Sequence, residues 1–391
     1  MNPRRPLTVL LAAGLGLTAA VAVAPAAAAA AAPGGPVVVA ANLNNPRGLS
    51  FLPDGSTLLV AEAGTGGADC FPGGPDGGTT CVGATGSVDA ITAPDTARNV
   101  APNRVVTGLL SAGGPGGIGA VGADSVDAVS LNGISIAMTY APPDVIPGGV
   151  PGEQAGKLLR GPAYRTPRTV ADISGYEIAN DPDGQGVDSN PYAVLVLADR
   201  TLVADAAGNS ILSVDRAGNV SVFAVLPNIQ TGKCAGRPND NGTTGCDFVP
   251  TSLARGPLGS VYVGGLGSET PGAGRVLRLD ATGRVTRTYG ALTSVSGLAV
   301  ASDGTVYASQ LSFDPTKGKV TRISADGLTR TDVAVPFPGG VAVSPRSGRI
   351  FAAAYSIAPA GGLGAPNSSG QVWRISFDGV PSTTLSPAEA V

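Results

Sequence analysis

The sequence predicts an all-β protein, a six-bladed β-propeller whose ring is closed by an N-terminal strand. Three observations support this prediction: a strand-turn-strand unit that occurs six times, one unpaired strand before the first unit, and a composition that disfavours long helices. The 391 residues include 58 glycines and 33 prolines, which interrupt helices and favour turns.

Each unit begins with an apolar strand, a tight polar turn and a second apolar strand. The six copies are residues 48–63, 126–139, 193–206, 252–265, 297–310 and 341–354. A third strand opened by glycine or serine follows, and then an outer strand such as residues 220–226. Short apolar runs between turns rich in Gly, Asp and Asn are typical of antiparallel hairpins. Four such strands in about 45 residues indicate a propeller blade.

The two ends of the repeat region predict how the ring closes. The sixth unit has a third strand at residues 371–376 but no convincing fourth strand, whereas Val37–Leu43 precedes the first unit without a partner. Pairing these two segments removes two exposed sheet edges. A stacked β-solenoid is the alternative fold, but it needs neither the hairpins nor the closing strand.

The first 32 residues predict a signal peptide, which leaves residues 33–391 as a propeller with disulfide-bearing loop insertions. Arg4 and Arg5 precede an apolar stretch, and an alanine run at 26–32 offers cleavage sites. A membrane anchor is the alternative, but the apolar stretch is shorter than the ~20 residues that a span requires. We therefore expect a secreted, extracytoplasmic protein with no membrane span in the mature chain.

Four cysteines occur as two local pairs, Cys70 with Cys81 and Cys234 with Cys246. Each pair encloses a short segment rich in Gly, Pro and Asp or Asn, as in a disulfide-stapled surface loop of an oxidising compartment. The alternative is a metal site, but the spacing does not match the C-x₂₋₄-C pattern of zinc modules. We expect two disulfides in surface loops at one end of the propeller.

The chain contains no histidine. This absence excludes histidine general bases, Ser-His-Asp and Cys-His catalysis, and metal sites with histidine ligands. The formal net charge is −3 with scattered basic residues, so nothing predicts nucleic-acid binding.

Several segments resemble a known family. Residues 202–220, LVADAAGNSILSVDRAGNV, resemble the NHL repeat of NHL/TolB-like propellers. Residues 44–64, the excursion between Cys70 and Cys81, and residues 188–209 resemble the ScyD/ScyE-like exported propellers, whose namesakes are periplasmic proteins encoded with the scytonemin biosynthetic genes. The resemblance covers roughly residues 36–379 and implies a secreted six-bladed propeller without an established catalytic residue. The chain departs from the family pattern at residues 122–130, where relatives carry a histidine.

Candidate site residues lie where strands begin and end around the predicted channel. Glu62 and Asp205 end equivalent second strands, and Arg47, Asn190 and Tyr192 lie where neighbouring strands begin. Two acids there could bind a cation or act as an acid-base pair. The alternative is structural: Asp205 would bond to the following turn, and Glu62 would pair with Arg47.

Calcium is the cation that the oxygen-rich segments favour. The candidate ligands are Glu62, Asp205 and Asn190, and residues 180–192 add Asp181, Asp183 and Asp188. Hard oxygen ligands on a glycine-containing loop suit Ca²⁺. However, an EF-hand loop starting at Asp181 would need a glutamate where Tyr192 stands, so an ordinary Asx- and Gly-rich loop is the alternative.

Three functional hypotheses are compatible with the sequence. The first is a monomeric, exported, non-catalytic binding or accessory propeller that presents a channel-mouth site to a metabolite or protein partner and requires no cofactor. The second is a divalent-cation-dependent hydrolase resembling gluconolactonases. The third is a structural surface protein.

Overall fold

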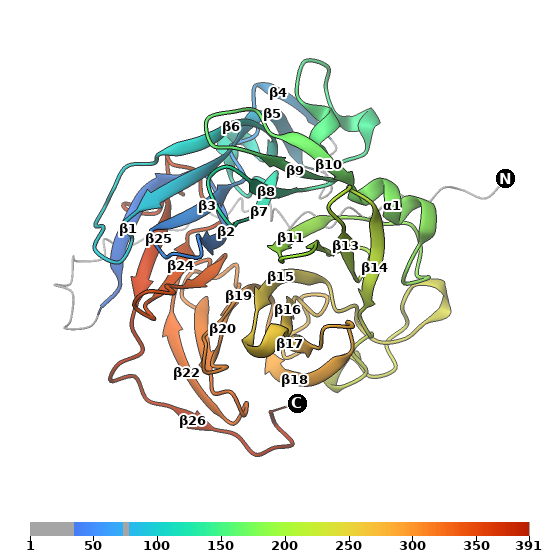
Figure 1. The fold of residues 1–391 in the computed structure, drawn as a ribbon, viewed down its shortest axis with the longest axis vertical. Helices are drawn as coiled ribbons and strands as arrows, with labels where there is room; N and C mark the ends of the chain where they lie inside the picture. Colours follow the sequence, from blue (N-terminus) through green and yellow to red (C-terminus); the bar gives the residue numbers. More distant parts are fainter. Residues whose placement is uncertain (1–34, 73–77, 391) are drawn as a thin grey trace.

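The computed structural model describes residues 35–72 and 78–390. Their strands form six antiparallel sheets arranged around one axis (Figure 1). The predicted six-bladed β-propeller is therefore confirmed. The segment predicted as a signal peptide, residues 1–32, lies outside the described residues. In the part of the chain that the structure describes, no helix combines the length and apolar character needed to cross a bilayer.

The blades share one strand order from the axis outward. The innermost strands are β2 (Pro46–Phe51), β7 (Ala123–Ala128), β11 (Pro191–Val196), β15 (Pro250–Arg255), β19 (Val295–Val300) and β23 (Val341–Val343). The second strands are β3 (Thr57–Glu62), β8 (Ile134–Met138), β12 (Thr201–Asp205), β16 (Val261–Gly265), β20 (Val306–Gln310) and β24 (Ile350–Ala354). The third strands are β5 (Thr79–Thr92), β9 (Lys157–Gly161), β13 (Ser210–Val214), β17 (Gly274–Leu279), β21 (Lys319–Ile323) and β25 (Gly370–Ile375). The outer strands are β6 (Arg104–Gly113), β10 (Arg168–Asp172), β14 (Val220–Val225), β18 (Val285–Leu292), β22 (Thr329–Ala334) and, in the sixth blade, β1 (Val37–Leu43).

A few elements lie outside this scheme. Strand β4 (Asp69–Pro72) pairs with an extension of β5, and β26 (Thr383–Thr384) adds a fifth strand to the fifth blade. One α-helix, α1 (Ile173–Asn180), joins the second blade to the third. Short 3₁₀ helices are η1 (Pro115–Gly117), η2 (Pro143–Val145), η3 (Gly152–Gln154), η4 (Gly232–Cys234), η5 (Asp240–Gly242) and η6 (Pro257–Gly259).

The predicted ring closure is confirmed. Strand β1 pairs antiparallel with β25, with Val37 opposite Arg374 and Leu43 opposite Gly370. Val39 and Leu43 are fully buried in a cluster that also contains Phe351. The chain after β25 has a role that the sequence analysis did not predict, because its short strand β26 covers the outer edge of β22.

The core lies between adjacent blades. One apolar cluster joins Leu59 of β3 to Ile136 of β8, and another joins Ile211 of β13 to Val263 of β16. Every residue of β3, β12 and β16 is buried, because both faces of these strands pack against a neighbouring sheet. This two-sided burial explains why the strands read as continuous apolar runs rather than alternating ones.

Both predicted disulfides are present, Cys70–Cys81 and Cys234–Cys246. The first does not lie in a loop as expected, because Cys70 in β4 and Cys81 in β5 are paired residues of adjacent strands. The excursion after β3 therefore folds back as its own hairpin. The second disulfide closes a loop between η4 and residue 246 and is buried beside Ile229.

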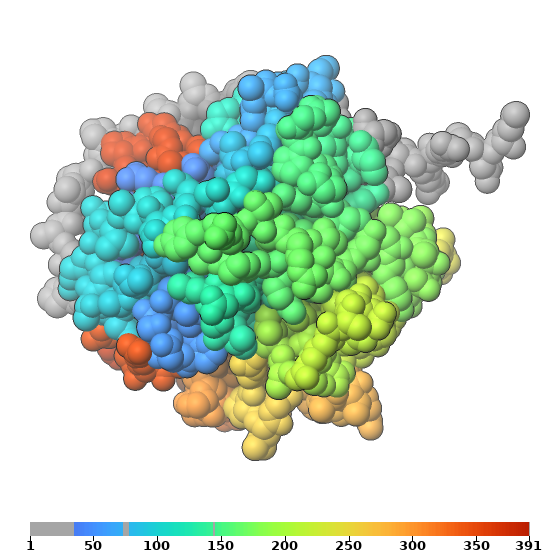
Figure 2. Space-filling model, turned by 45° about the horizontal axis from the view of Figure 1, so that its top comes forward, coloured from blue at the N-terminus to red at the C-terminus, as the bar shows by residue number. Residues whose placement is uncertain are grey.

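The antiparallel strand order places particular loops at the same end of the ring. Within each blade the four strands run alternately from one end of the ring to the other. The second and the outer strand therefore both finish at the end where the innermost strand began, and the connection to the next blade starts there. We call this the connection end. It carries α1 and both disulfide-bearing insertions. In Figure 2 the green surface of the second and third blades forms a broad part of the face shown.

Candidate functional site

The six innermost strands enclose a cavity on the propeller axis. Its volume is about 370 Å³, and its lining includes residues from all six blades. Cavities of roughly 300–1,000 Å³ with a few convergent polar groups are typical of small-molecule sites. The axial cavity is therefore a candidate small-molecule binding site.

A repeated backbone irregularity places polar side chains in this cavity. In β7, β11, β15 and β19 the pairing register skips the second residue of the strand, and in β2 it skips the second and third residues, Arg47 and Gly48, which is the mark of a β-bulge. A bulge leaves one extra residue unpaired and changes the direction of its side chain. The five extra residues all line the cavity, and we call them the bulge ring: Arg47, Asp124, Tyr192, Thr251 and Ser296.

The sequence analysis identified Arg47 and Tyr192 but missed the other three members of the bulge ring. A usable signal is present in three of the five strands, where the ring residue directly follows a proline that begins the strand: Pro46, Pro191 and Pro250.

Asp124 and Arg47 are the charged members of the bulge ring, and both are buried. Asp124 is 1% exposed, and neither of its carboxylate oxygens accepts a hydrogen bond of ordinary geometry, although the Gly122 backbone N–H lies near enough to lower its pKa. Arg47 donates from Nη2 to the Ala120 carbonyl oxygen at 2.5 Å, whereas its Nε has no partner. Buried polar groups normally have hydrogen-bond partners. This pair therefore leaves a buried acceptor and a buried donor without partners of ordinary geometry beside the cavity.

The electrostatics of the bulge ring depend on burial. Burial raises the pKa of the Asp124 carboxyl to about 7, although the positive charge of Arg47 opposes this effect. Burial also raises the pKa of the Tyr192 hydroxyl, on which the charges of Arg47 and Asp124 act in opposite directions. Because Asp124 titrates near neutral pH, it can either accept or donate a hydrogen bond under physiological conditions.

Glu62 belongs to a separate network within the first blade. It is fully buried, and its carboxylate forms a bidentate ion pair with Arg104, with Nε–Oε1 at 2.9 Å and Nη2–Oε2 at 3.1 Å. It also accepts hydrogen bonds from the Ser87 hydroxyl, at 2.7 Å, and from the Asn44 backbone N–H. The structural alternative predicted an ion pair between Glu62 and Arg47. This prediction is wrong, because Glu62 pairs with Arg104 on the outer strand β6 instead.

Asp89 lies beside this ion pair and changes its protonation. Burial and the neighbouring Glu62 carboxylate raise the pKa of Asp89 to about 9. Burial alone would raise the pKa of Glu62 as well, but hydrogen bonds with Asp89, Arg104 and the Asn44 backbone hold it below its ordinary value. The network therefore carries one ionised carboxylate, on Glu62, opposite the single guanidinium.

Asp205 and Asn190 lie together in the third blade. The fully buried Asp205 carboxylate accepts hydrogen bonds from the Ser189 hydroxyl at 2.6 Å, the Asn190 backbone N–H at 2.6 Å and the Gly208 backbone N–H at 3.2 Å. The Asn190 side chain accepts a hydrogen bond from the Thr139 hydroxyl at 3.0 Å. Asp205 thus bonds to the following turn, as the structural alternative expected. The structure does not bring Asp205 and Glu62 into one network.

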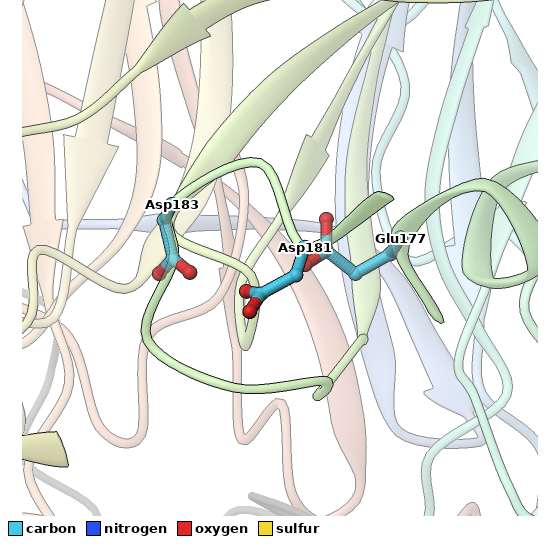
Figure 3. Close-up of side chains that lie close together, drawn as sticks. All are labelled: Glu177, Asp181 and Asp183. Atoms are coloured by element: carbon cyan, nitrogen blue, oxygen red, sulfur yellow. The ribbon is translucent and has the colours of Figure 1, made fainter. Parts of the chain in front are cut away.

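A second group of acids surrounds the end of α1. Asp172 caps the helix N-terminus, and Asp181, whose φ of 42° is left-handed, caps the C-terminus after Asn180. Glu177, Asp181 and Asp183 each place one carboxylate oxygen within 4.8 Å of the others. Figure 3 shows Asp181 between the other two side chains. The sequence analysis identified Asp181 and Asp183 as oxygen ligands but missed Glu177, because a glutamate inside a helix gives no local signal.

The closed ring of six antiparallel blades with a polar axial cavity defines the protein as a six-bladed β-propeller. No protein-family model and no curated protein matches the sequence.

Among solved structures, the chain is similar to regucalcin, a calcium-binding protein from Agrobacterium tumefaciens. The two are 13% identical with a TM-score of 0.50, and the match covers 92% of this chain and 97% of regucalcin. A streptogramin B lyase is 10% identical with a TM-score of 0.46, over 88% of this chain and 97% of the lyase. A putative gluconolactonase is 14% identical with a TM-score of 0.41, over 90% and 95% of the two chains. At 13% identity the similarity to regucalcin shows a shared fold alone.

Proposed function

We propose that this protein is an exported binding propeller that holds a small, neutral, hydroxyl-rich molecule in its axial cavity. The observation that carries the proposal is Asp124, a buried carboxyl group on the wall of that cavity whose oxygens accept no hydrogen bond of ordinary geometry. Two disulfides fit an extracytoplasmic location.

The proposed ligand chemistry follows from what the cavity wall lacks. Asp124 needs donors, the Nε of Arg47 needs an acceptor, and the Ser252 hydroxyl, which also lines the cavity, is buried without a partner. Two arginines, Arg47 and Arg255, and two aspartates, Asp124 and Asp127, line the cavity, so neither sign of charge dominates and the cavity favours a ligand without net charge. A polyol or sugar supplies donors and acceptors from the same hydroxyl groups.

The cavity offers little support for the alternative, a cation-dependent hydrolase resembling gluconolactonases. Two carboxylates, Asp124 and Asp127, line it, and its lining contains no amide side chain. Asp127 already accepts hydrogen bonds from the Ser50 hydroxyl at 2.5 Å and the Val196 N–H at 2.7 Å. A divalent cation at Asp124 would face the guanidinium of Arg47. These residues do not fit a catalytic metal, and we derive no reaction from one.

The finer family assignment is part of the same proposal. The ScyD/ScyE-like assignment rests on the sequence resemblance of residues 44–64 and 188–209, which occupy equivalent places in their blades. In each segment an innermost strand with a bulge, β2 or β11, pairs with a second strand that ends in a buried acid, Glu62 or Asp205.

A thermal-shift screen with monosaccharides, disaccharides and linear polyols tests the proposed function, and isothermal titration calorimetry of the compounds that stabilise the protein follows. We expect Asp124→Asn to weaken their binding at least about tenfold, because a hydrogen bond to a charged group contributes about 1.5–3 kcal/mol. The matched control, Asp303→Asn, changes an exposed aspartate and should bind as the wild type does. The proposal fails if no polyol or sugar binds, or if Asp124→Asn binds them equally well.

A further inference from the structure

Glu177 is a buried carboxylate whose role the proposed function leaves unexplained. Its side chain is 0% exposed, and neither carboxylate oxygen has a hydrogen-bond partner. None of the ion pairs among the described residues includes it. An ionised carboxylate is costly to bury unless it is paired, hydrogen-bonded or bound to a metal.

The neighbouring backbone leaves room for this carboxylate. A Cβ atom at Gly208 would lie 2.6 Å from the Glu177 carboxyl carbon, so a larger residue at position 208 would collide with it. The Glu177 carboxylate therefore lies directly against the turn that follows β12.

Two aspartates place carboxylate oxygens close to Glu177. One oxygen from each of Glu177, Asp181 and Asp183 lies within 4.8 Å of the other two (Figure 3). Backbone N–H groups hold both aspartates in place, from Gly186 to Asp181 at 3.2 Å and from Gln185 to Asp183 at 2.9 Å. These bonds leave lone pairs on both carboxylates, because each ionised carboxylate has about four acceptor positions.

The surroundings of the three carboxylates are also negative. The charges of Asp205 and Asp188 act on Glu177 in the same direction as those of Asp181 and Asp183. One oxygen of Asp188 is itself buried without a partner. A bound cation would relieve this mutual repulsion.

We propose that Glu177, Asp181 and Asp183 form a calcium site at the connection end, between α1 and the third blade. Ca²⁺ binds six to eight oxygens at 2.3–2.6 Å, so two oxygens on one ion lie up to about 5 Å apart, which matches the observed spacing. Mg²⁺ demands a tighter octahedron at about 2.1 Å and retains its water. The site shares no residue with the lining of the axial cavity.

The site also connects two insertions. Gln185 donates to Asp183 at 3.0 Å and accepts from Asn239 at 3.2 Å, and Asn241 donates to the Gly184 carbonyl oxygen at 2.9 Å. Asn239 and Asn241 belong to the loop closed by Cys234–Cys246. Calcium at this position would brace the disulfide loop against the loop that follows α1.

The test compares melting temperatures of the full-length protein, freed of metal by a chelator, in CaCl₂ and in MgCl₂. We expect Ca²⁺ to raise the melting temperature of the wild type by several degrees and Mg²⁺ to raise it less. Glu177→Gln should abolish the increase without lowering the melting temperature in the absence of cation, because glutamine keeps nearly the shape of the glutamate side chain and adds no charge to the cluster. Glu153→Gln, an exposed control, should keep the full increase. Asp183→Asn replaces Glu177→Gln as the test variant if the latter does not fold.

The outcomes separate this site from the axial cavity. Asp124→Asn should keep the calcium response, and Glu177→Gln should keep polyol binding. An unchanged melting temperature of the wild type in Ca²⁺, together with no calorimetric heat, overturns the proposal. A calcium response that persists in both Glu177→Gln and Asp183→Asn also overturns it. An equal response to Mg²⁺ overturns the assignment to calcium.

Discussion

At the scale of single residues, the propeller holds buried acids in three different states. Glu62 is ionised against Arg104, Asp89 beside it has a pKa of about 9, and Asp124 on the cavity wall has a pKa of about 7. Burial raises the pKa of each carboxyl group by favouring its neutral form. A neighbouring positive charge reduces this increase, and a neighbouring negative charge adds to it. A buried carboxyl group therefore serves as an ion-pair partner in one blade and as a candidate ligand-binding group in another.

Asp124 should make the stability of the protein depend on pH in a predictable direction. Its folded-state pKa of about 7 lies above the ordinary value of 3.8, so the folded protein keeps this proton to a higher pH than the unfolded chain. The free energy of unfolding should therefore fall as the pH rises from about 4 to about 7, by an amount on the order of 4 kcal/mol at ~1.4 kcal/mol per pKa unit. Arg47 and Tyr192 are the ionisable groups facing it.

Urea unfolding at pH 5 and pH 8 measures this contribution. The difference between the two pH values should be smaller in Asp124→Asn than in the wild type, because asparagine does not titrate. Asp303→Asn, an exposed control, should retain nearly the wild-type difference. Equal pH dependence in Asp124→Asn and the wild type would contradict the prediction.

Arg104 and Glu62 should respond unequally to substitution. Arg104→Met leaves a fully buried Glu62 carboxylate without its partner, and removing one partner of a buried ion pair costs roughly 3–5 kcal/mol. Glu62→Gln should cost less, because the Arg104 side chain is 35% exposed and can be hydrated. Chemical denaturation of both variants tests this order. Lys317→Met, which breaks an exposed ion pair with Asp314, should change stability by less than about 1 kcal/mol.

At the scale of single elements, irregular segments provide the candidate sites on a regular framework. The bulges in five innermost strands direct five side chains into the axial cavity. The connection containing α1 brings Glu177 close to Asp181 and Asp183. The regular second and third strands are almost entirely buried between blades, and so they hold these irregular segments in place.

The Cys234–Cys246 disulfide should stabilise the connection end. Cross-linking closes a loop of about 12 residues, which stabilises the folded state by roughly 2–3 kcal/mol in the chain-entropy treatment. The double variant Cys234→Ser with Cys246→Ser should lose about this much stability and expose its loop to protease. Peptide mapping without reduction should recover the two linked pairs from the wild type. A double variant with wild-type stability would show that the buried contacts of the loop hold it without the cross-link.

At the scale of the whole molecule, closure of the ring depends on both ends of the repeat region. Strand β1 supplies the outer edge of the last blade and buries Val39 and Leu43. Complete burial of such a side chain contributes about 1.5–3 kcal/mol. Strand β26 contributes less, because its two residues are exposed.

Deletion of residues 33–43 should therefore open the ring. We expect a lower melting temperature and aggregation, because the deletion bares the edge of β25 and removes apolar contacts with the first blade. Light scattering during a thermal melt measures both effects. Deletion of residues 381–391, which removes β26, is the matched control and should have a much smaller effect. An unchanged melting temperature after deletion of residues 33–43 would contradict the closure argument.

The sequence by itself determined the six blades, the closing strand and both disulfide pairs. These features rest on local patterns: apolar runs between turns, one unpaired strand, and cysteines close together in the chain. It also identified Arg47 and Tyr192 from their positions at the beginning of strands. Such patterns are readable because each arises from residues near one another in sequence.

Only the tertiary structure decided which acids have partners and which do not. Glu62 and Asp205 look equivalent in sequence, yet Arg104 from an outer strand neutralises one, and backbone N–H groups satisfy the other. Asp124 and Glu177 gave no local signal, because their importance comes from being buried without a partner. Whether an acid is buried and which group it pairs with depend on residues distant in sequence. The residues next to that acid in the chain therefore cannot predict either property.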